Sequence, residues 1–286
     1  NNKVFVILTN VKLNSIANNI NKYLKMLGYS SKITNEFNKI NEKSNEIYII
    51  LFVKFFTELK NELPTKYIVY QMEQIRSNMF TKSYYKMLSS AYKIFEFSEA
   101  NNFYLNQIKR NDLIINNFPL ITENHNEDFE YDILFYGELN NRRLAILRKL
   151  QNDFNIIVRN DIFNEERDNL IKKSKIVLNL HYYHDACLET CRVNEVLRFN
   201  RLVISEEPID RDDKNRNLYK NSVQYFDLIK SNLSNIEIAV NKIKYCLANY
   251  EKLIKNMDVK DIELVCKNQF TKNINTILYG DLQTEK

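Results

Sequence analysis

Short apolar runs alternate with segments of helical periodicity along most of the chain. In the first half, runs typical of buried strands cover residues 3–9, 46–53, 66–71 and 93–97. Apolar residues recur at helical spacing over residues 13–27, 56–64, 83–92 and 101–108. Gly28 follows the first of these segments and predicts a helix end. Strands that alternate with helices indicate a mostly parallel, doubly wound α/β sheet with right-handed crossovers.

The pattern is interrupted once and then restarts. Residues 122–128 read TENHNED, contain no apolar side chain and predict a linker. After them we expect strands over residues 131–136, 155–158, 176–180, 202–205 and 223–226, and helices over residues 142–150, 165–173, 189–199, 236–254 and 259–279. The sequence therefore predicts two Rossmann-like domains, residues 1–124 and 125–265, and a helical tail, residues 266–286, packed toward the first domain.

The composition is that of a globular chain, with 44% hydrophobic and 27% charged residues over 286 positions. The formal net charge of +5 is modest and spread out, which argues against nucleic acid as the main partner. The four cysteines have no framework spacing, which suggests a reducing compartment. No apolar run approaches the ~18 residues of a membrane span, and no signal peptide pattern is present. We expect a cytoplasmic protein, with peripheral membrane association left open.

The stretch of residues 176–207 carries the main candidate site. Its sequence, IVLNLHYYHDACLETCRVNEVLRFNRLVISEE, predicts a strand, a polar loop, a helix and a second strand. His181, Glu189 and Arg192 lie where the first strand ends and the helix begins. In an open α/β sheet, ligands bind outside the carboxyl ends of the strands, and a helix start offers free N–H groups to a phosphate. This position predicts a ligand site.

Glu189, Arg192 and Glu195 are spaced three apart, so neighbours can pair along one helix face. The alternative is a solvated ion-pair ladder, which would add little to stability. Because the helix lies between two apolar strands, we expect it to be largely covered. Covered carboxylates usually have a partner or a role, so we favour a functional interpretation.

A second candidate is the turn from Gly137 to Arg143, which follows the first strand of the second half. Glycine lets the backbone approach a ligand, Asn140 or Asn141 can cap the helix, and arginine gives a phosphate a fixed charge. The alternative is a capped helix whose arginines are solvated. Neither a GxGxxG fingerprint nor a Walker loop occurs, which disfavours a nicotinamide dehydrogenase or a P-loop kinase.

Metal and cysteine chemistry are less well supported by the sequence. The side chains that invite a zinc site fall within one loop and helix start, in a spacing that fits no zinc pattern: His181, His184, Asp185, Cys187 and Cys191. We therefore expect no metal, and His181 suits hydrogen bonding to a bound anion or sugar. Cys187 shows no sign of a triad, and a buried cysteine is the default.

The runs YDILFYGELNNRRLAILRKL and IVLNLHYYHDACLETCRVNEVLRFNRLVISE resemble the nucleotide-sugar-binding half of GT-B glycosyltransferases, in particular group-1-like and spore-maturation-type glycosyltransferase-like proteins. The likeness covers residues 131–207, and the run YQMEQI in the first half is a weaker match to the family. The resemblance implies a GT-B fold, in which two Rossmann-like domains face a central cleft. Two departures are an E-x5-E spacing of Glu189 and Glu195 where the family often has E-x7-E, and Asn200-Arg201 in place of Gly-Pro.

The resemblance also implies roles for individual residues. Arg142 or Arg143 would contact the donor diphosphate, and Glu195 would hold the ribose hydroxyls. The donor site would also include Gly137, Asn141, His181, Glu189 and Arg192, with His181 and Glu189 near the reacting sugar. Gln71 and Glu73 end a first-half strand and would face the cleft, where Glu73 is the candidate base of an inverting reaction. Their alternative role is a strand-end cap.

These observations predict a glycosyltransferase that moves a sugar from a nucleotide sugar, UDP- or GDP-linked, to a glycan, a protein or another hydroxyl acceptor. The leaving diphosphate can be stabilised by arginine, backbone N–H groups and a helix dipole without a metal. We expect no further cofactor. The alternatives are a catalytically degenerate binding or regulatory module of the same fold and a sugar-nucleotide epimerase.

Overall fold

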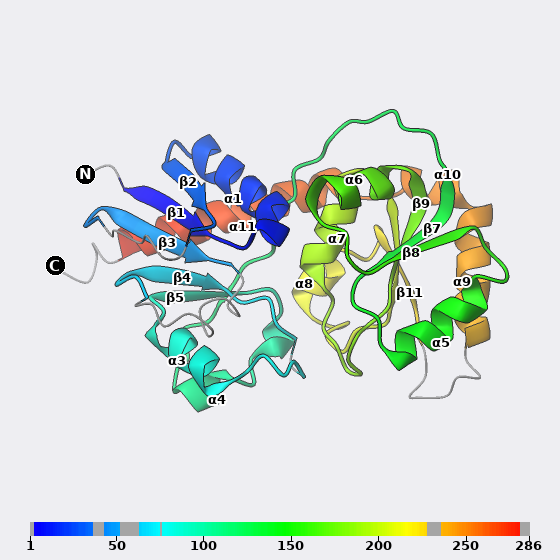
Figure 1. The fold of residues 1–286 in the computed structure, drawn as a ribbon. Coiled ribbons are helices and arrows are strands. Elements are labelled where there is room, and N and C mark those ends of the chain that lie inside the picture. The colour runs from blue at the N-terminus through cyan, green and yellow to red at the C-terminus, as the bar shows by residue number, and fades with distance from the viewer. Residues whose placement is uncertain (1–2, 37–42, 52–62, 75, 228–235, 281–286) are drawn as a thin grey trace. The chain divides into compact units, whose positions relative to one another are not determined.

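The computed structural model describes residues 3–36, 43–51, 63–74, 76–227 and 236–280. The chain divides into two compact units (Figure 1). The N-terminal unit comprises Asn1–Pro119 together with Leu264–Lys286, and the C-terminal unit comprises Leu120–Glu263. Each unit has its own parallel sheet, so the predicted fold class of two Rossmann-like α/β domains is confirmed.

In the N-terminal unit, a six-stranded sheet has the order β2-β1-β3-β4-β5-β6 with every pair parallel. Its strands are β1 (Val4–Leu8), β2 (Ser30–Thr34), β3 (Glu46–Ile50), β4 (Tyr67–Tyr70), β5 (Lys93–Glu96) and β6 (Ile114–Ile115). Its helices are α1 (Asn14–Met26), α3 (Lys82–Ser90), α4 (Leu105–Ile108) and most of α11 (Val259–Tyr279). The helix predicted around residues 56–64 lies largely outside the described residues.

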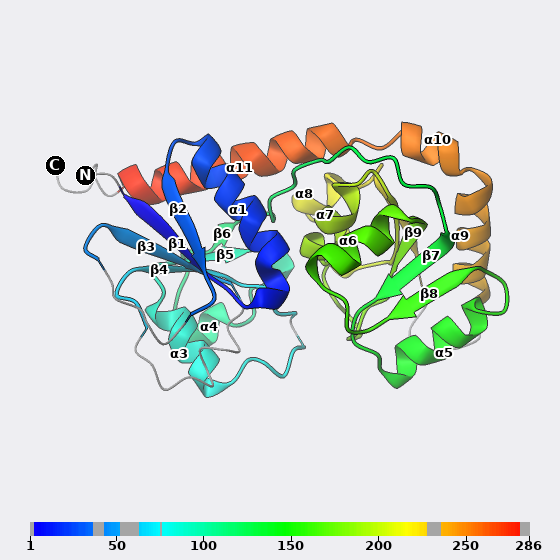
Figure 2. The ribbon, with the colours of Figure 1, turned by 45° about the horizontal axis from the view of Figure 1, so that its top comes forward.

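The helix α1 forms as the sequence predicts, because its apolar residues fall on one face. Ile16, Ile20 and Leu24 are buried, and Gly28 ends the helix with a φ of +82°. The helix α11 lies beside α1 (Figure 2), where the rings of Tyr23 and Phe270 meet edge to face. The pattern missed β2 because this edge strand has no fully buried residue and therefore no apolar run.

In the C-terminal unit, a five-stranded parallel sheet has the order β11-β10-β9-β7-β8. Its strands are β7 (Tyr131–Tyr136), β8 (Ile156–Arg159), β9 (Ser174–Asn179), β10 (Leu202–Glu206) and β11 (Val223–Phe226). Its helices are α5 (Asn141–Leu150), α6 (Asn164–Lys172), α7 (Thr190–Leu197), α8 (Lys214–Asn217), α9 (Ile236–Ala248), α10 (Tyr250–Lys255) and the first turn of α11. The chain leaves β7 in one direction for β8 and returns on its other side to β9. The strand order therefore reverses between β7 and β9, the kind of place where open α/β sheets bind ligands.

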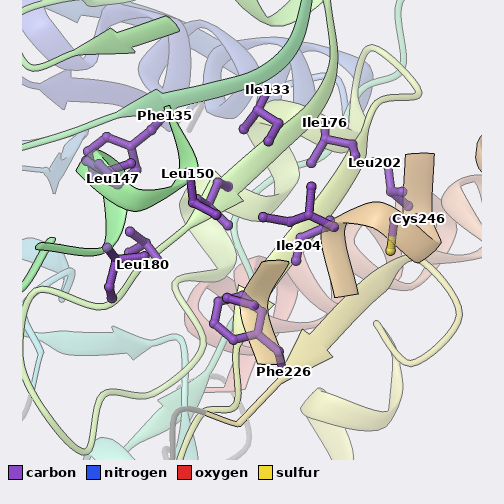
Figure 3. Close-up of a cluster of buried hydrophobic side chains, with 14 of the residues drawn as sticks. Ile133, Phe135, Leu147, Leu150, Ile176, Leu180, Leu202, Ile204, Phe226 and Cys246 are labelled. Carbon is purple, nitrogen blue, oxygen red and sulfur yellow. The ribbon is translucent and has the colours of Figure 1, made fainter. Parts of the chain in front are cut away.

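The core of this unit lies between the sheet and helices α5 and α9 (Figure 3). Ile133, Ile176 and Ile204 come from three neighbouring strands, and Leu147 and Cys246 come from the two helices. All five side chains are at least 98% buried. This packing fixes where the carboxyl ends of β7, β9 and β10 lie, and hence the position of any site built on them.

Two helix predictions are wrong in extent. The helix expected over residues 236–254 is broken at Asn249, whose side-chain amide donates to the Tyr245 carbonyl. The next residue, Tyr250, turns into the core and meets Phe129 edge to face. The helix expected over residues 101–108 is shortened to α4, because the side chain of Asn101 is buried in hydrogen bonds to residues outside the helix.

Residues 122–128, predicted as a linker, contain no helix or strand but are held by specific contacts. The Glu123 backbone N–H donates to the Arg198 carbonyl, and its carboxylate forms an ion pair with the Arg198 guanidinium. The His125 Nε2 lies 2.8 Å from the Phe199 carbonyl oxygen. A polar composition therefore did not mean a loose segment. Among the described residues, none of the helices is long and apolar enough to cross a membrane.

Candidate functional site

A cluster of charged side chains gathers at the carboxyl ends of β7, β9 and β10, beside the starts of α5 and α7. It lies where the strand order reverses. The structure brings together here six of the predicted donor-site residues: Gly137, Arg142, Arg143, His181, Glu189 and Arg192. Asn141 is the first residue of α5, at the same edge.

Gly137 directly follows β7 and has a φ of +132°, a backbone conformation that residues other than glycine rarely adopt. A Cβ at this position would lie 2.9 Å from Nη2 of Arg192 and 3.5 Å from Nη1 of Arg143. The absence of a side chain thus lets two guanidinium groups approach the backbone. Glycine is required here for both its conformation and its size.

The helix α5 begins as a capped helix, with Asn140 rather than Asn141 as the cap. The Asn140 side-chain oxygen accepts from the Arg143 backbone N–H at 2.9 Å. The side chain of Arg143 is not solvated, since the residue is only 2% exposed and donates to the carbonyls of Glu138 and Leu180. Burial, together with the nearby charge of Arg192, lowers the pKa of Arg143 to about 10.

Arg142 points to a different partner. Both of its terminal nitrogens donate to the carboxylate of Glu206, and Nη1 also donates to the His181 carbonyl at 2.9 Å. Glu206, the last residue of β10, accepts in addition from the His181 backbone N–H at 2.6 Å. Arg142 and Glu206 thus fasten β10 to the end of β9, and the guanidinium of Arg142 is engaged by the protein.

Arg192 lies on the first turn of α7 and reaches back to the end of β7. Its Nη1 donates to the Tyr136 carbonyl at 2.6 Å, and its guanidinium carbon lies 4.9 Å from the centre of the Tyr136 ring. Its Nε is 3.4 Å from a carboxylate oxygen of Glu189, so the predicted pairing of these two residues is present. Burial raises the pKa of Glu189, but the charges of Arg192 and Arg143 outweigh it and leave that pKa below its ordinary value.

His181 follows β9 and is 96% buried, with 4% of its surface exposed. Its ring Nε2 is buried without a hydrogen-bond partner. Burial holds the pKa of His181 below its ordinary value, which favours the neutral ring near pH 7. A buried ring nitrogen without a partner is costly, so this atom is a natural contact for a polar ligand.

Glu195 does not pair with Arg192, contrary to what its spacing suggested. Its Oε1 lies 2.6 Å from Nη1 of Arg167 on α6, and both side chains are less than 10% exposed. Arg167 also forms an ion pair with Asp168, and Asp168 forms a second one with Arg198. Burial raises the pKa of Glu195, and Arg167 opposes that shift. The carboxylate is therefore held by a neighbouring helix.

Sequence reasoning missed three residues of this region: Tyr136, Arg167 and Glu206. Glu206 could have been found, because it directly follows a predicted strand, as His181 does. Arg167 gave no signal, since it lies in a helix of mostly polar residues whose covered face is set by the fold.

Gln71 and Glu73 lie at the carboxyl end of β4 in the N-terminal unit. The Gln71 side chain is fully buried and bonds to the backbone of Glu73 at both its N–H, 2.6 Å, and its carbonyl, 2.9 Å. The Glu73 carboxylate is half-buried and accepts from the Ser77 hydroxyl at 2.7 Å. Gln71 therefore acts as a strand-end cap and also fixes the turn that carries Glu73.

The zinc and cysteine candidates gain no support from the geometry. In the part of the chain that the structure describes, no group of three or more His, Cys, Asp or Glu side chains is arranged to hold a metal ion. Cys187 is buried, and burial raises the pKa of Cys191 well above its ordinary value. A thiol in such surroundings is a poor nucleophile.

No protein-family model matches the chain. A search of curated proteins found an uncharacterised protein of Acanthamoeba polyphaga mimivirus, R358, that is 27% identical over 202 residues. The match covers 67% of this chain and 66% of that protein, a little under two thirds of its length.

Solved structures match over nearly the whole chain at low sequence identity. An alpha-glucosyltransferase in complex with UDP-glucose and DNA has a TM-score of 0.56 at 10% identity, over 96% of this chain and 98% of that one. A putative UDP-N-acetylglucosamine 2-epimerase from Listeria monocytogenes has a TM-score of 0.57 at 8% identity, with 96% of both chains covered. WaaG, a glycosyltransferase involved in lipopolysaccharide biosynthesis, has a TM-score of 0.52 at 10% identity, over 96% and 99%. The chain therefore has the GT-B fold that nucleotide-sugar glycosyltransferases and epimerases share.

Proposed function

We propose that this protein is a glycosyltransferase whose C-terminal unit binds a nucleotide-sugar donor and whose N-terminal unit presents a hydroxyl acceptor. One observation carries the proposal. At the reversal of strand order, two guanidinium groups lie beside Gly137, and the start of α7 and the partnerless Nε2 of His181 lie at the same sheet edge. Positive charge, free backbone N–H groups and a close backbone approach are what a diphosphate needs.

The geometry ranks the arginines differently from the sequence. Arg142 is engaged by Glu206, and Arg143 is buried against backbone carbonyls. Arg192 lies beside Gly137 on the first turn of α7, and its 3.4 Å contact with Glu189 is longer than the 2.8 Å bond from Arg142 to Glu206. We therefore assign the direct contact with the diphosphate to Arg192, with Arg143 adding positive charge from behind.

The remaining roles follow the resemblance. Glu195, fixed by Arg167, accepts from the ribose hydroxyls, and His181 bonds to the sugar or the phosphate. In the reaction, the bond from the sugar C1 to the diphosphate oxygen breaks as a bond to the acceptor oxygen forms. The departing diphosphate carries the negative charge that the guanidinium groups stabilise. If the reaction inverts, Glu73 takes the acceptor proton.

Calorimetry with UDP, GDP, dTDP and their common sugar conjugates, with and without EDTA, tests the donor site. We expect one nucleotide to bind at micromolar affinity, unchanged by EDTA. Arg192→Ala is expected to weaken it at least tenfold, while Arg148→Ala, an exposed position on α5, leaves it unchanged. Failure of every nucleotide to bind would contradict the proposal and favour a degenerate module.

Product analysis by NMR distinguishes sugar transfer from epimerisation of the nucleotide sugar. An epimerase shares the fold with a TM-score of 0.57, so its activity is a specific alternative. A transferase releases the nucleotide and forms a new glycosidic bond or, with water as acceptor, the free sugar. Conversion of the nucleotide sugar to its epimer without an acceptor would contradict transfer.

A further inference from the structure

A buried carboxylate in the N-terminal unit has no role in the function proposed above. Glu96 is the last residue of β5 and is completely buried. Its Oε1 accepts from the Phe97 N–H at 2.8 Å and from the Asn101 amide at 3.2 Å. Its Oε2 accepts from the Gln71 amide at 2.8 Å and the Tyr104 hydroxyl at 3.0 Å. The Ser98 N–H also donates to Oε1 at 3.4 Å, and all five donors are uncharged.

Two of these donors also hold the backbone of Glu73. The Gln71 amide donates to the Glu73 carbonyl at 2.9 Å, and the Gln71 oxygen accepts from the Glu73 N–H at 2.6 Å. The Asn101 amide donates to the same carbonyl at 2.7 Å. Both polar atoms of the Glu73 peptide groups are therefore held by side chains that Glu96 orients. The Tyr84 hydroxyl completes the cluster through a 2.6 Å bond to the Gln71 oxygen.

The side chain of Glu73 is more exposed than the residues that hold its backbone. It is half-buried and accepts from the Ser77 hydroxyl, whereas Gln71, Glu96 and Asn101 are fully buried. A carboxylate buried among neutral donors is an expensive way to stabilise a fold, because desolvation opposes it and no opposite charge compensates. It is an effective way to fix a turn, since a carboxylate accepts several hydrogen bonds of set direction at once.

We propose that Glu96 is a positioning residue, which through Gln71 and Asn101 holds the turn that presents the Glu73 carboxylate to the acceptor hydroxyl. This inference rests on the proposed function in its inverting form, in which Glu73 receives the acceptor proton. Glu96 touches neither substrate. It acts through the two amides, so its removal moves the reacting carboxylate and leaves donor binding in the other unit intact.

The direct test of positioning uses hydrogen exchange of the Glu73 amide. At pH 9, above the raised pKa of about 8, Glu96 is a charged carboxylate, and Glu96→Gln keeps the size of the side chain but turns one acceptor oxygen into a donor that faces other donors. We expect the Glu73 amide to exchange at least tenfold faster in this variant, while amides of β7 and β9 are unchanged. Glu99→Gln, an exposed position three residues further on, is the matched control. Unchanged exchange at Glu73 would overturn the proposal.

The functional test measures nucleotide release from UDP-glucose and GDP-mannose at the same pH of 9, with water as acceptor, for single and double variants. We expect Glu73→Gln and Glu96→Gln each to lower the turnover number at least tenfold with little change in the donor KM. The double variant is expected to be no slower than Glu73→Gln alone, because both changes remove the same group from the reaction. Effects that multiply in the double variant would show that Glu96 acts independently and would overturn the proposal.

Asn101→Ala provides a second route if Glu96→Gln folds poorly. It removes one link to the Glu73 carbonyl and leaves the Glu96 carboxylate in place. Faster exchange at Glu73 and the same non-additivity with Glu73→Gln are expected. Nucleotide binding by the unmodified protein is measured in parallel. Absence of that binding would contradict the proposed function, whereas binding by the unmodified protein without faster exchange in the variants would contradict the positioning role alone.

Discussion

Each unit has a polar cluster at the carboxyl ends of the strands of its own parallel sheet, but the two clusters are built from different side chains. At the carboxyl ends of β4 and β5, amides and hydroxyls surround the buried carboxylate of Glu96. At the carboxyl ends of β7, β9 and β10, guanidinium groups gather around backbone carbonyls and carboxylates. The first arrangement positions a turn, and the second accumulates positive charge.

This contrast shows that the fold alone does not determine function. Both sheets of the GT-B fold can bind a ligand at the carboxyl ends of their strands, but the fold does not determine which ligand. The side chains decide this, through the charge they bring and the partners they engage. This difference supports our proposal that the C-terminal unit binds the donor and that the N-terminal unit carries the acceptor chemistry.

The largest expected effect concerns the ion pair between Arg167 and Glu195. Both side chains are buried, so removing one leaves the other charge uncompensated. Glu195→Ala should lower the free energy of unfolding by about 3–5 kcal/mol, as measured by urea denaturation. Glu165→Ala, an exposed position on α6, should change it by less than about 0.5 kcal/mol. A Glu195 variant of normal stability would mean that the pair is not closely coupled.

The second prediction sharpens the contrast through pH. Burial raises the pKa of Glu96 to about 8, although its hydrogen bonds lower it. The folded state then binds a proton that the unfolded state, with a pKa near 4.5, has released, so stability falls as the pH rises between these values. From pH 5 to 8 the loss would be at most roughly 4 kcal/mol. Glu96→Gln should remove this part of the dependence, and a pH profile identical to that of the unmodified protein would contradict it.

Gly137→Ala comes next in size. The added Cβ would lie 2.9 Å from Arg192 on a backbone with a φ of +132°. We expect a loss of about 1–3 kcal/mol in the free energy of unfolding and a weaker affinity for nucleotide, since Arg192 must move. The control is Gly280→Ala, where the nearest atom would be a side-chain carbon at 3.6 Å. Equal effects of the two substitutions would show that Arg192 does not depend on Gly137.

The smallest expected effect compares two helix caps. Asn140 caps α5 in the C-terminal unit, and Thr81 caps α3 in the N-terminal unit. Replacing either by alanine should lower the free energy of unfolding by about 1 kcal/mol. Only Asn140→Ala should also weaken nucleotide binding, because it loosens the start of the helix that carries Arg142 and Arg143. Weaker binding in Thr81→Ala would contradict the assignment of the donor to the C-terminal unit.

Much of the fold could be predicted from the sequence because its signals are local. The bounds of β7, β11 and α11 match the prediction residue for residue, since apolar runs and helical spacing mark them without ambiguity. The strand β2 was missed because only its pairing with β1 marks it, and the break at Asn249 was missed because Tyr250 packs against Phe129, far away in the sequence.

The candidate site shows the same limit more sharply. Strand ends and helix starts predicted that His181 and Arg192 would lie together, the resemblance added Gly137, and the structure places all three at one sheet edge. Sequence spacing could not show that Glu195 pairs with Arg167 or that Glu206 engages Arg142, because these partners come from other elements. Glu96 lies inside the apolar run of residues 93–97 and gave no signal of its own, and only its hydrogen bonds show what it holds.

The most direct test of the central claim is calorimetric titration of UDP and GDP into two variants, one from each edge. If the C-terminal unit binds the donor, Arg192→Ala should lose at least tenfold in affinity, about 1.4 kcal/mol. Glu96→Gln should bind within twofold of the unmodified protein. Normal affinity in Arg192→Ala, or loss of affinity in Glu96→Gln, would contradict this division of roles between the two units.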